Sequence, residues 1–388
     1  MTHQKGPALD RVALEKLRRI APNALAVRRA QASDTWRPLG GPEEVAFKLT
    51  NRCDLRCSHC YQWGEGGYHH ALEADVRRGD LSLDIVRRVL AATHTSKSNL
   101  YLWGGEPLLY RDWDGLVELL SEDPRWTSIC TNGTLIERRM DSLLRISETL
   151  EMSVSIEGFE TEHDLVRGAG SYRRMMAGLG LLLSKREAGC YRGEITMNFV
   201  ITNPMIGRIH ELLCQLQDLG VDTVYISYPW YLSDDAGRRM DAYYAEHFDW
   251  PIAGSKRSWE SYRYSLDLAR IDVLISELTR IDSTGWSMKV RYNPELSTDD
   301  LKGFIGGSHV PAQGKTRCHS TQTRMDVFPD GQVVSCKFFP EFRVGDLHEN
   351  DVMDVWMGKR FDHLRRTVAE CGLMPVCAKC NLLYTRGG

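Results

Sequence analysis

Residues 48–61 read Lys48-Leu-Thr-Asn-Arg-Cys53-Asp-Leu-Arg-Cys57-Ser-His-Cys60-Tyr61, so three cysteines within eight residues follow directly on the apolar run 44–50. Three thiolates at this spacing can surround one metal centre. A four-iron cluster is normally held by four cysteines, and one held by three would leave an iron open for another ligand. A structural zinc ion also needs four ligands, so the alternative is a Cys3His zinc site completed by His59, His69 or His70.

Outward from this loop, residues 44–228 alternate six short apolar runs with longer amphipathic patterns, which indicates βα units and a parallel sheet. The expected strands are 44–50, 100–103, 127–131, 152–157, 195–201 and 223–227. The expected helices are 83–92, 113–121, 135–146, 171–187 and 206–219, the first with Ser82 as its N-cap. The motif residues fall at the carboxyl ends of the strands, where parallel α/β sheets bind ligands.

The regular alternation ends after residue 228. We expect an N-terminal helical extension over 1–43, the barrel over 44–228, a connector over 229–317 and a small cysteine-bearing domain over 318–388. The connector should hold a helix at 266–279, a strand at 286–291 and a helix at 297–304, and should flank a substrate pocket. In the last domain, Pro329-Asp330-Gly331 predicts a hairpin between strands 325–328 and 333–336, followed by a helix at 355–368.

The composition excludes several classes of protein. The chain has 388 residues, enough for one large domain with an appendage. Its 49 Lys and Arg against 52 Asp and Glu give a net charge of −3, which offers no basic excess for coating nucleic acid or an anionic membrane. No apolar run is long enough to span a membrane, and residues 1–30 lack the apolar core of a signal peptide. We therefore expect a cytoplasmic protein that binds neither nucleic acid nor membrane.

The eleven cysteines fall into two groups. Cys53, Cys57 and Cys60 lie near the start, Cys318, Cys336, Cys371, Cys377 and Cys380 lie near the end, and Cys130, Cys190 and Cys214 lie between. This number is too low for a disulfide scaffold in a chain of this length, so metal binding is the better explanation. The division into groups predicts two separate metal–thiolate sites.

Two further motifs follow the second and third strands, namely Trp103-Gly104-Gly105-Glu106-Pro107 and Thr131-Asn132-Gly133. Together with the cysteine spacing they resemble the radical S-adenosylmethionine superfamily, and the six βα units resemble its partial (β/α)6 barrel. The resemblance covers residues 44–228. It implies that Cys53, Cys57 and Cys60 hold a 4Fe-4S cluster whose open iron binds the amino and carboxylate groups of S-adenosylmethionine. One electron would then cleave this cofactor to methionine and a 5′-deoxyadenosyl radical.

The same resemblance implies roles for residues around the cofactor. Gly104 and Gly105 would let the backbone approach its methionyl part closely, and Glu106 would supply negative charge for its ammonium. His59 matches the family position that packs on adenine. We also expect Asn132 to bind the cofactor.

The fourth strand, with Ser153, Ser155 and Glu157, and the Asp-x-x-Arg motif that ends at Arg167 are similar to the subgroup with cysteine-rich C-terminal extensions. Strand alternation predicts that the two serines and Glu157 share one face, and we expect the serines and Arg167 to bind the cofactor. The family commonly has Asp where this chain has Glu157, so Glu157 is a candidate on the substrate side. Asn198 on the fifth strand is either a further cofactor-binding residue or a structural one.

In the C-terminal domain, Cys318-x17-Cys336 and Cys377-x2-Cys380 resemble the auxiliary-cluster domain of the SPASM/twitch subgroup in its shorter form. The resemblance implies one auxiliary 4Fe-4S cluster with all four irons ligated by these cysteines. A zinc knuckle on the same thiolates is the alternative, which spacing alone leaves open. Cys371 has no assigned role.

The implied chemistry is removal of a hydrogen from an unactivated carbon of a bound substrate. A fully ligated auxiliary cluster suits an electron acceptor, so we expect a net two-electron oxidation, either a dehydrogenation or a cross-link. Return of a hydrogen by a thiol would instead give epimerisation, and Cys130, Cys190, Cys214 and Cys371 are the possible donors. Glu157, Cys214 and Cys371 are the candidate catalytic residues.

For the substrate, the resemblance implies a peptide in natural-product maturation or a small molecule of the aminoglycoside or sugar type. The aromatic connector suits both. A peptide would need a separate leader-binding protein or none, and an electron donor such as flavodoxin or ferredoxin is an expected partner. Two non-catalytic classes are the alternatives: an iron–sulfur electron carrier, which does not explain the Gly-Gly-Glu loop, and a zinc-dependent interaction module, which does not explain six βα units.

Overall fold

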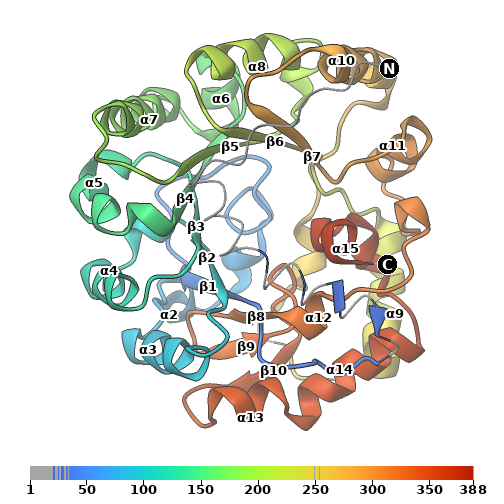
Figure 1. Cartoon of the computed structure of the whole chain (residues 1–388). Coiled ribbons are helices and arrows are strands. Elements are labelled where there is room, and N and C mark those ends of the chain that lie inside the picture. The colour runs from blue at the N-terminus through green and yellow to red at the C-terminus, as the bar shows by residue number, and fades with distance from the viewer. Residues whose placement is uncertain are drawn as a thin grey trace.

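A computed structural model describes residues 35–248, 250–252 and 254–387, together with residues 21, 25, 28, 29, 32 and 33. Most of the extension predicted for 1–43 lies outside the described residues. Within them, the main element is a ten-stranded sheet in the order β10-β9-β8-β1-β2-β3-β4-β5-β6-β7. Figure 1 shows its strands curving around a central space with helices on the outside. The α/β partial barrel predicted from the sequence is confirmed.

Eight neighbouring strands of this sheet run parallel. They are β1 (Glu44–Thr50), β2 (Asn99–Gly104), β3 (Thr127–Thr131), β4 (Leu150–Ile156), β5 (Glu194–Val200), β6 (Thr223–Ser227), β7 (Lys289–Asn293) and β8 (Arg324–Val327). At one edge β9 (Gln332–Val334) and β10 (Arg343–Asp346) continue the sheet antiparallel. The six strands expected over 44–227 are β1 to β6, with small shifts at their ends.

The two faces of strand β1 pack against different parts of the barrel. Val45, Phe47 and Leu49 pack into the main core beneath the outer helices, whereas Ala46 packs with Trp103 of β2 on the inner face. A parallel strand covered on both faces is expected to be apolar throughout, which explains the run that precedes the cysteine loop.

The helices follow the predicted order with several additions. Outside the barrel lie α3 (Leu83–Ala92), α4 (Trp113–Glu122), α5 (Ile136–Arg145), α6 (Glu160–Arg167), α7 (Ser171–Glu187), α8 (Ile209–Asp218) and α10 (Ile271–Ser283). The others are α2 (Ala74–Arg77), α9 (Asp234–His247), α11 (Thr298–Ile305), α12 (Ser320–Thr323), α13 (Val352–Trp356), α14 (Lys359–Glu370) and α15 (Asn381–Arg386). Short 3₁₀ helices are η1 (Tyr68–Ala71), η2 (Pro107–Leu109), η3 (Ser147–Thr149), η4 (Asn203–Met205), η5 (Ser258–Ser261), η6 (Leu268–Arg270), η7 (Ala312–Gly314) and η8 (Pro375–Lys379). The Ser82 side chain caps α3 by accepting a hydrogen bond from the Asp84 backbone N–H.

The connector departs from the expectation in two ways. Its strand pairs in parallel with β6 and so adds a seventh strand to the barrel. Helix α9, which the sequence analysis did not predict, buries Ala236, Met240 and Tyr244, four residues apart, on one face. In the C-terminal region, the single helix expected at 355–368 is interrupted at Met357-Gly358 and becomes α13 and α14.

The C-terminal domain is joined to the barrel through its predicted hairpin. β8 pairs in parallel with β1, with Glu44 opposite Arg324 and Phe47 opposite Val327. The hairpin therefore continues the barrel sheet, and α15 lies in the gap between β7 and β8 in Figure 1. In the described part of the chain, no helix has the length and hydropathy of a membrane span.

Candidate functional site

The carboxyl ends of the strands enclose a cavity of about 340 Å³. Cys53, Cys57 and Cys60 all line it, which brings the predicted cluster ligands to one wall. His59, Gly104, Gly105, Asn132, Ser155 and Arg167 line it as well. The described residues include no group of three or more His, Cys, Asp and Glu positioned to hold a single metal ion. In a four-iron cluster each thiolate binds a different iron, so its ligands lie further apart than ligands that share one ion.

The structure gives a further reason for glycine at positions 104 and 105, which the sequence analysis did not identify. A Cβ on Gly104 would collide with the carbonyl oxygen of Thr50, and one on Gly105 with that of Arg52. The Gly105 N–H donates to the Thr50 carbonyl at 2.8 Å. Glycine is therefore required for the loop after β2 to pack against the start of the cysteine loop.

Glu106 is buried beneath this loop and is not among the residues that line the cavity. Its carboxylate accepts hydrogen bonds from the Leu108 N–H at 3.0 Å, the Thr131 hydroxyl at 2.7 Å and the Asn132 N–H at 2.8 Å. Burial raises its pKa to about 7. Three protein donors already hold this carboxylate, so its predicted role toward the cofactor ammonium stays a prediction.

Asp54, which the sequence analysis did not single out, fixes the cysteine loop from the other side. Its carboxylate accepts from Asn132 Nδ2 at 2.8 Å and from the Thr134 hydroxyl at 2.7 Å. The loop after β1 is thereby tied to the loop after β3. An acid between Cys53 and Leu55 gives no signal of this role in the sequence, because both partners come from a distant segment.

A buried ion pair lies behind the histidine of the loop. Glu157 is fully buried and accepts from Arg167 Nε at 3.0 Å and Nη2 at 2.6 Å, and His59 Nε2 lies 3.0 Å from the same carboxylate oxygen. Burial alone would raise the pKa of Glu157, but Arg167 and His59 lower it. The carboxylate positions these two residues at the cavity wall and is not itself among the lining residues. This position gives Glu157 a structural contact with both residues, and its assignment to the substrate side stays a prediction.

The two serines of β4 lie at different levels of the barrel. Ser155 lines the cysteine cavity, whereas Ser153 and Asn198 line a second cavity of about 620 Å³ and are hydrogen-bonded to each other. Tyr101, Lys337 and Asn381 line both cavities, so the second cavity continues the first through the barrel. The predicted contacts of Ser153 and Asn198 with the cofactor are thus not supported by their position.

Lys337, which the sequence analysis missed, lies at the junction of these cavities. It is 8% exposed and has neither a hydrogen bond nor an acid within 4 Å among the described residues. Its ammonium lies 4.4 Å from the centre of the Tyr101 ring and 4.6 Å from that of Phe338. Burial lowers its pKa to about 8. A buried cation without an acidic partner is costly unless an anion binds beside it.

The four C-terminal cysteines come from three segments that meet inside an aromatic core. Cys318 precedes α12, Cys336 follows β9, and Cys377 and Cys380 belong to η8 and its end. The thiols of Cys336 and Cys380 are close enough to interact, as are those of Cys318 and Cys377. Cys380 is buried in the core, and the other three pack against it. The structure therefore brings together the four cysteines predicted to hold the auxiliary cluster.

Aromatic rings connect the two cysteine groups. Tyr61, next to Cys60, stacks on Tyr262 with 4.6 Å between ring centres, and its ring lies 6.3 Å from that of Phe338. Phe338 follows Cys336 by two residues, and its ring centre is 4.0 Å from that of Trp230. These rings form one wall of the cavity, so the side chains between the two sites are mainly aromatic.

The remaining cysteines differ in where they lie. Cys130 lines the cavity and forms a hydrogen bond with the Tyr101 hydroxyl. Cys190 and Cys371 are exposed, and Cys214 lies on outer helix α8 with its sulfur 3.6 Å from His210 Nδ1. Cys214 and Cys371 are not among the residues that line the cavity, so their position does not support the prediction that they are catalytic residues.

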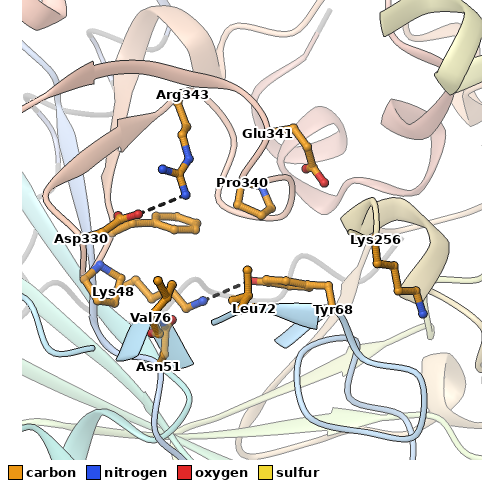
Figure 2. Close-up of a pocket in the computed structure, with 12 residues that line it drawn as sticks. Lys48, Asn51, Tyr68, Leu72, Val76, Lys256, Asp330, Pro340, Glu341 and Arg343 are labelled. Carbon is orange, nitrogen blue, oxygen red and sulfur yellow. Dashed lines mark hydrogen bonds and ion pairs between the residues drawn. The ribbon is translucent and has the colours of Figure 1, made fainter. Parts of the chain in front are cut away.

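A third pocket lies between the start of the cysteine loop and the hairpin turn, as Figure 2 shows. Lys48 Nζ donates to the Tyr68 hydroxyl at 3.0 Å and lies 3.0 Å from His69 Nε2, and Asp330 pairs with Arg343 at 3.1 Å. Burial lowers the pKa of Lys48 to about 7. With a volume of about 30 Å³ the pocket has room for water but not for a substrate.

Two family models match the chain. That of the radical SAM superfamily matches residues 47–186, and that of an iron–sulfur cluster-binding domain, SPASM, matches residues 318–381. The first covers the end of β1, the cysteine loop and the strands β2 to β4. The second covers Cys318, Cys336, Cys377 and Cys380.

Similar proteins span most of the chain. An AdoMet-dependent heme synthase of Methanosarcina barkeri is 31% identical over 352 residues, which are 87% of this chain and 91% of that protein. The pre-heme d1 synthase of Dinoroseobacter shibae is 27% identical over 328 residues, 82% and 74% of the two chains. Among solved structures, SuiB of Streptococcus suis bound to S-adenosylmethionine has a TM-score of 0.58 at 17% identity, covering 96% of this chain and 79% of SuiB. The same protein bound to its precursor peptide SuiA has a TM-score of 0.57.

Proposed function

Because this chain belongs to the radical S-adenosylmethionine superfamily, we propose that it removes a hydrogen atom from an unactivated C–H bond of a bound substrate and completes a two-electron oxidation. The observation that carries the proposal is that one cavity adjoins both cysteine groups. Cys53, Cys57 and Cys60 line it, and Lys337 and Phe338, which directly follow Cys336, line it as well.

The residues at the cavity wall fit the cofactors of the family, S-adenosylmethionine and 4Fe-4S clusters. When bound at the three loop cysteines, these groups supply a 5′-deoxyadenosyl radical after transfer of one electron. We assign the contacts with S-adenosylmethionine to His59, Gly104, Gly105, Asn132, Ser155 and Arg167, all of which line the cavity. Gln62 Oε1 and Trp103 Nε1 are buried at the same wall and have no hydrogen-bond partner among the described residues, as expected where a polar ligand binds.

The four C-terminal cysteines support oxidation as the outcome. Four thiolates leave no open iron, so this site suits transfer of an electron better than binding of substrate. The electron would leave the substrate across the aromatic wall of Tyr61, Tyr262 and Phe338. Burial of this site in an apolar core keeps water away from it.

For the substrate we propose a molecule that carries a carboxylate, and a peptide in natural-product maturation as its class. Lys337 supplies the buried cation, and the Asn381 side-chain oxygen in the same lining has no hydrogen-bond partner in the described part of the chain. The names of the relatives support a second class, because heme and its precursors are small molecules with carboxylate side chains. A leader-binding protein is an expected partner for a peptide but not for a tetrapyrrole.

One observation favours a second outcome. Of the cysteines outside the two groups, Cys130 alone lines the cavity within the described part of the chain. A hydrogen returned by its thiol to the substrate would leave the substrate at its original oxidation level, as in epimerisation. Reduction of the resulting sulfur radical would then need one electron and one proton from outside, whereas oxidation needs no such repair.

The class of reaction is tested with protein reconstituted under anaerobic conditions. We expect about eight irons in each chain and formation of 5′-deoxyadenosine with dithionite. Zinc in place of iron at either site, or no 5′-deoxyadenosine, would contradict the proposal.

The substrate class is tested with acids and their methyl esters, using peptides that contain Asp or Glu and a tetrapyrrole that bears propionates. We expect one acid to bind about tenfold or more tightly than its ester, because a hydrogen bond to a charged group contributes about 1.5–3 kcal/mol. Lys337→Met should abolish this difference, whereas Lys302→Met, at an exposed lysine, should keep it. Equal binding of acid and ester by the unmodified protein would refute the carboxylate assignment.

A further inference from the structure

Lys48 is a buried lysine that the proposed reaction does not use. It lies on β1, shortly before Cys53, and is 1% exposed. Figure 2 shows its ammonium directed at the Tyr68 hydroxyl, to which it donates at 3.0 Å. His69 Nε2 lies 3.0 Å from the same nitrogen. Because an ammonium only donates, His69 Nε2 is the acceptor when Lys48 is charged.

No acid compensates this charge directly. Among the described residues, no carboxylate lies within 4 Å of the Lys48 nitrogen. The two acids that line the pocket beside it are bound to other groups. Asp330 pairs with Arg343 at 3.1 Å. Glu341 accepts from the Ser258 N–H at 2.6 Å and from its hydroxyl at 2.7 Å. A buried cation in this position is costly unless negative charge lies nearby.

The two partners of Lys48 lie directly behind the chain segment that follows Cys60. The backbone N–H groups of Tyr68 and His69 donate to the carbonyl oxygens of the two residues after Cys60, at 3.0 and 3.1 Å. The His69 ring meets the Trp63 ring edge to face, with 4.8 Å between their centres. The Trp63 N–H in turn donates to Cys60 Sγ at 3.4 Å. A short chain of contacts therefore runs from Lys48 to the Cys60 sulfur.

The surroundings of Lys48 screen its charge poorly. Its nitrogen lies 5.4 Å from the centre of the Trp103 ring and 4.9 Å from that of Phe328, and the pocket beside it has room only for water. Charges interact more strongly in such a medium than in bulk water. Burial lowers the pKa of Lys48 to about 7, whereas Asp330 and the Cys60 thiolate oppose this lowering. A bound cluster adds negative charge on the Cys60 side and so favours the charged lysine.

We propose that the charge of Lys48 raises the reduction potential of the 4Fe-4S cluster at Cys53, Cys57 and Cys60. The inference rests on the proposed function, because it assumes that cluster. Reduction by one electron adds one negative charge to the cluster, so a nearby cation stabilises the reduced form more than the oxidised form. Lys48 thereby makes the first electron transfer easier without contacting S-adenosylmethionine.

The test is a redox titration of the anaerobically reconstituted protein, followed by electron paramagnetic resonance. S-adenosylmethionine binds the open iron, so the signal that changes when it is added belongs to the loop cluster. For Lys48→Met, which keeps the length of the side chain but not its charge, we expect the reduction equilibrium to shift about tenfold or more toward the oxidised cluster. For one electron this shift lowers the potential by about 59 mV.

Two further variants separate charge from other effects. Lys256 lines the same pocket but donates to the Gly66 carbonyl, so Lys256→Met makes the same change in net charge and should shift the equilibrium less than about twofold. Tyr68→Phe removes the hydrogen-bond acceptor of Lys48 but keeps the ring and the lysine. We expect a shift smaller than about threefold, because a neutral hydrogen bond contributes only about 1 kcal/mol and the charge stays in place.

Each remaining outcome decides the matter. An unchanged potential of the loop cluster in Lys48→Met would overturn the proposal, and so would an equal shift in Lys256→Met or Tyr68→Phe. If Lys48→Met does not retain iron, Lys48→Gln takes its place with the same expected shift. Loss of iron by both variants would assign Lys48 to holding the loop together and would also overturn the proposal. Absence of a signal that responds to S-adenosylmethionine in the unmodified protein would instead refute the proposed function.

Discussion

The two cysteine groups differ in how the chain makes them and in what surrounds them. Cys53, Cys57 and Cys60 belong to one loop and line a cavity of about 340 Å³ at the carboxyl ends of the strands. The C-terminal four come from three segments and lie in an aromatic core. The first arrangement suits exchange with S-adenosylmethionine and an external donor, whereas the second suits transfer inside the protein. Under the proposed function, this difference would let the two sites act at different stages of one reaction.

Removal of the loop cysteines is expected to have the largest effect. Replacing Cys53, Cys57 and Cys60 with Ala should abolish formation of 5′-deoxyadenosine and lower the iron content from about eight to about four per chain. The fold should survive, since the barrel core does not depend on these side chains. Iron analysis and product chromatography measure both results. Residual cleavage of S-adenosylmethionine by the triple variant would mean that formation of the radical does not require the loop cysteines, contrary to the proposal.

Removal of one C-terminal ligand should separate radical formation from turnover. Cys377→Ala is expected to cleave S-adenosylmethionine but to form no substrate-derived product, because the electron acceptor is incomplete. Cys371→Ala is the control, since Cys371 is exposed on the same domain, and it should behave normally. Full product formation by a Cys377 variant shown to lack the auxiliary cluster would remove the distinction between the sites.

The ion pair behind the first site should be important for stability. Glu157→Gln leaves the buried charge of Arg167 unpaired, which we expect to cost about 3–5 kcal/mol of unfolding free energy. Glu160→Gln, which breaks a largely exposed pair with Arg173, should cost no more than about 1 kcal/mol. Urea unfolding measures both variants. Similar losses would show that Glu157 does not brace His59 and Arg167 as the geometry suggests.

The smallest effect is expected for replacement of Cys130, the cysteine that lines the cavity. Under oxidation as proposed, Cys130→Ala should change the yield less than about twofold, and mass spectrometry should still find a product lighter by two hydrogens. Cys190→Ala, at an exposed cysteine, is the control. A product of unchanged mass that contains one solvent deuterium, and that disappears in the Cys130 variant only, would establish hydrogen return instead.

Local patterns predicted the barrel well and placed the motif residues of the first site at the strand ends. Strands β1, β3 and β6 and helices α3 and α7 have the expected bounds. The loop cysteines and the Gly-Gly motif adjoin one cavity because strand ends in a parallel sheet meet at one edge. These features depend on residues close together in the sequence.

The unpredicted features depend on pairings between distant segments. The partner of β8 is β1, and nothing in a short hairpin specifies which sheet edge it joins. The binding partners of Asp54 and the exposure of Lys337 to the cavity are likewise set by tertiary packing. Glu157 was assigned to the substrate side because the family commonly has Asp at this position, and the sequence does not show that Glu157 pairs with His59 and Arg167.

The pairing of β8 with β1 also bears on synthesis. The ribosome makes β1 among the first strands of the barrel, yet one of its two neighbours appears only when residues 324–327 emerge. Until then the N–H and C=O groups along that edge of β1 lack their partners, and an unpaired edge invites association with other chains. Pairing across so much sequence also raises the contact order and slows folding. The barrel that generates the radical can therefore close its sheet only after most of the auxiliary hairpin has left the ribosome.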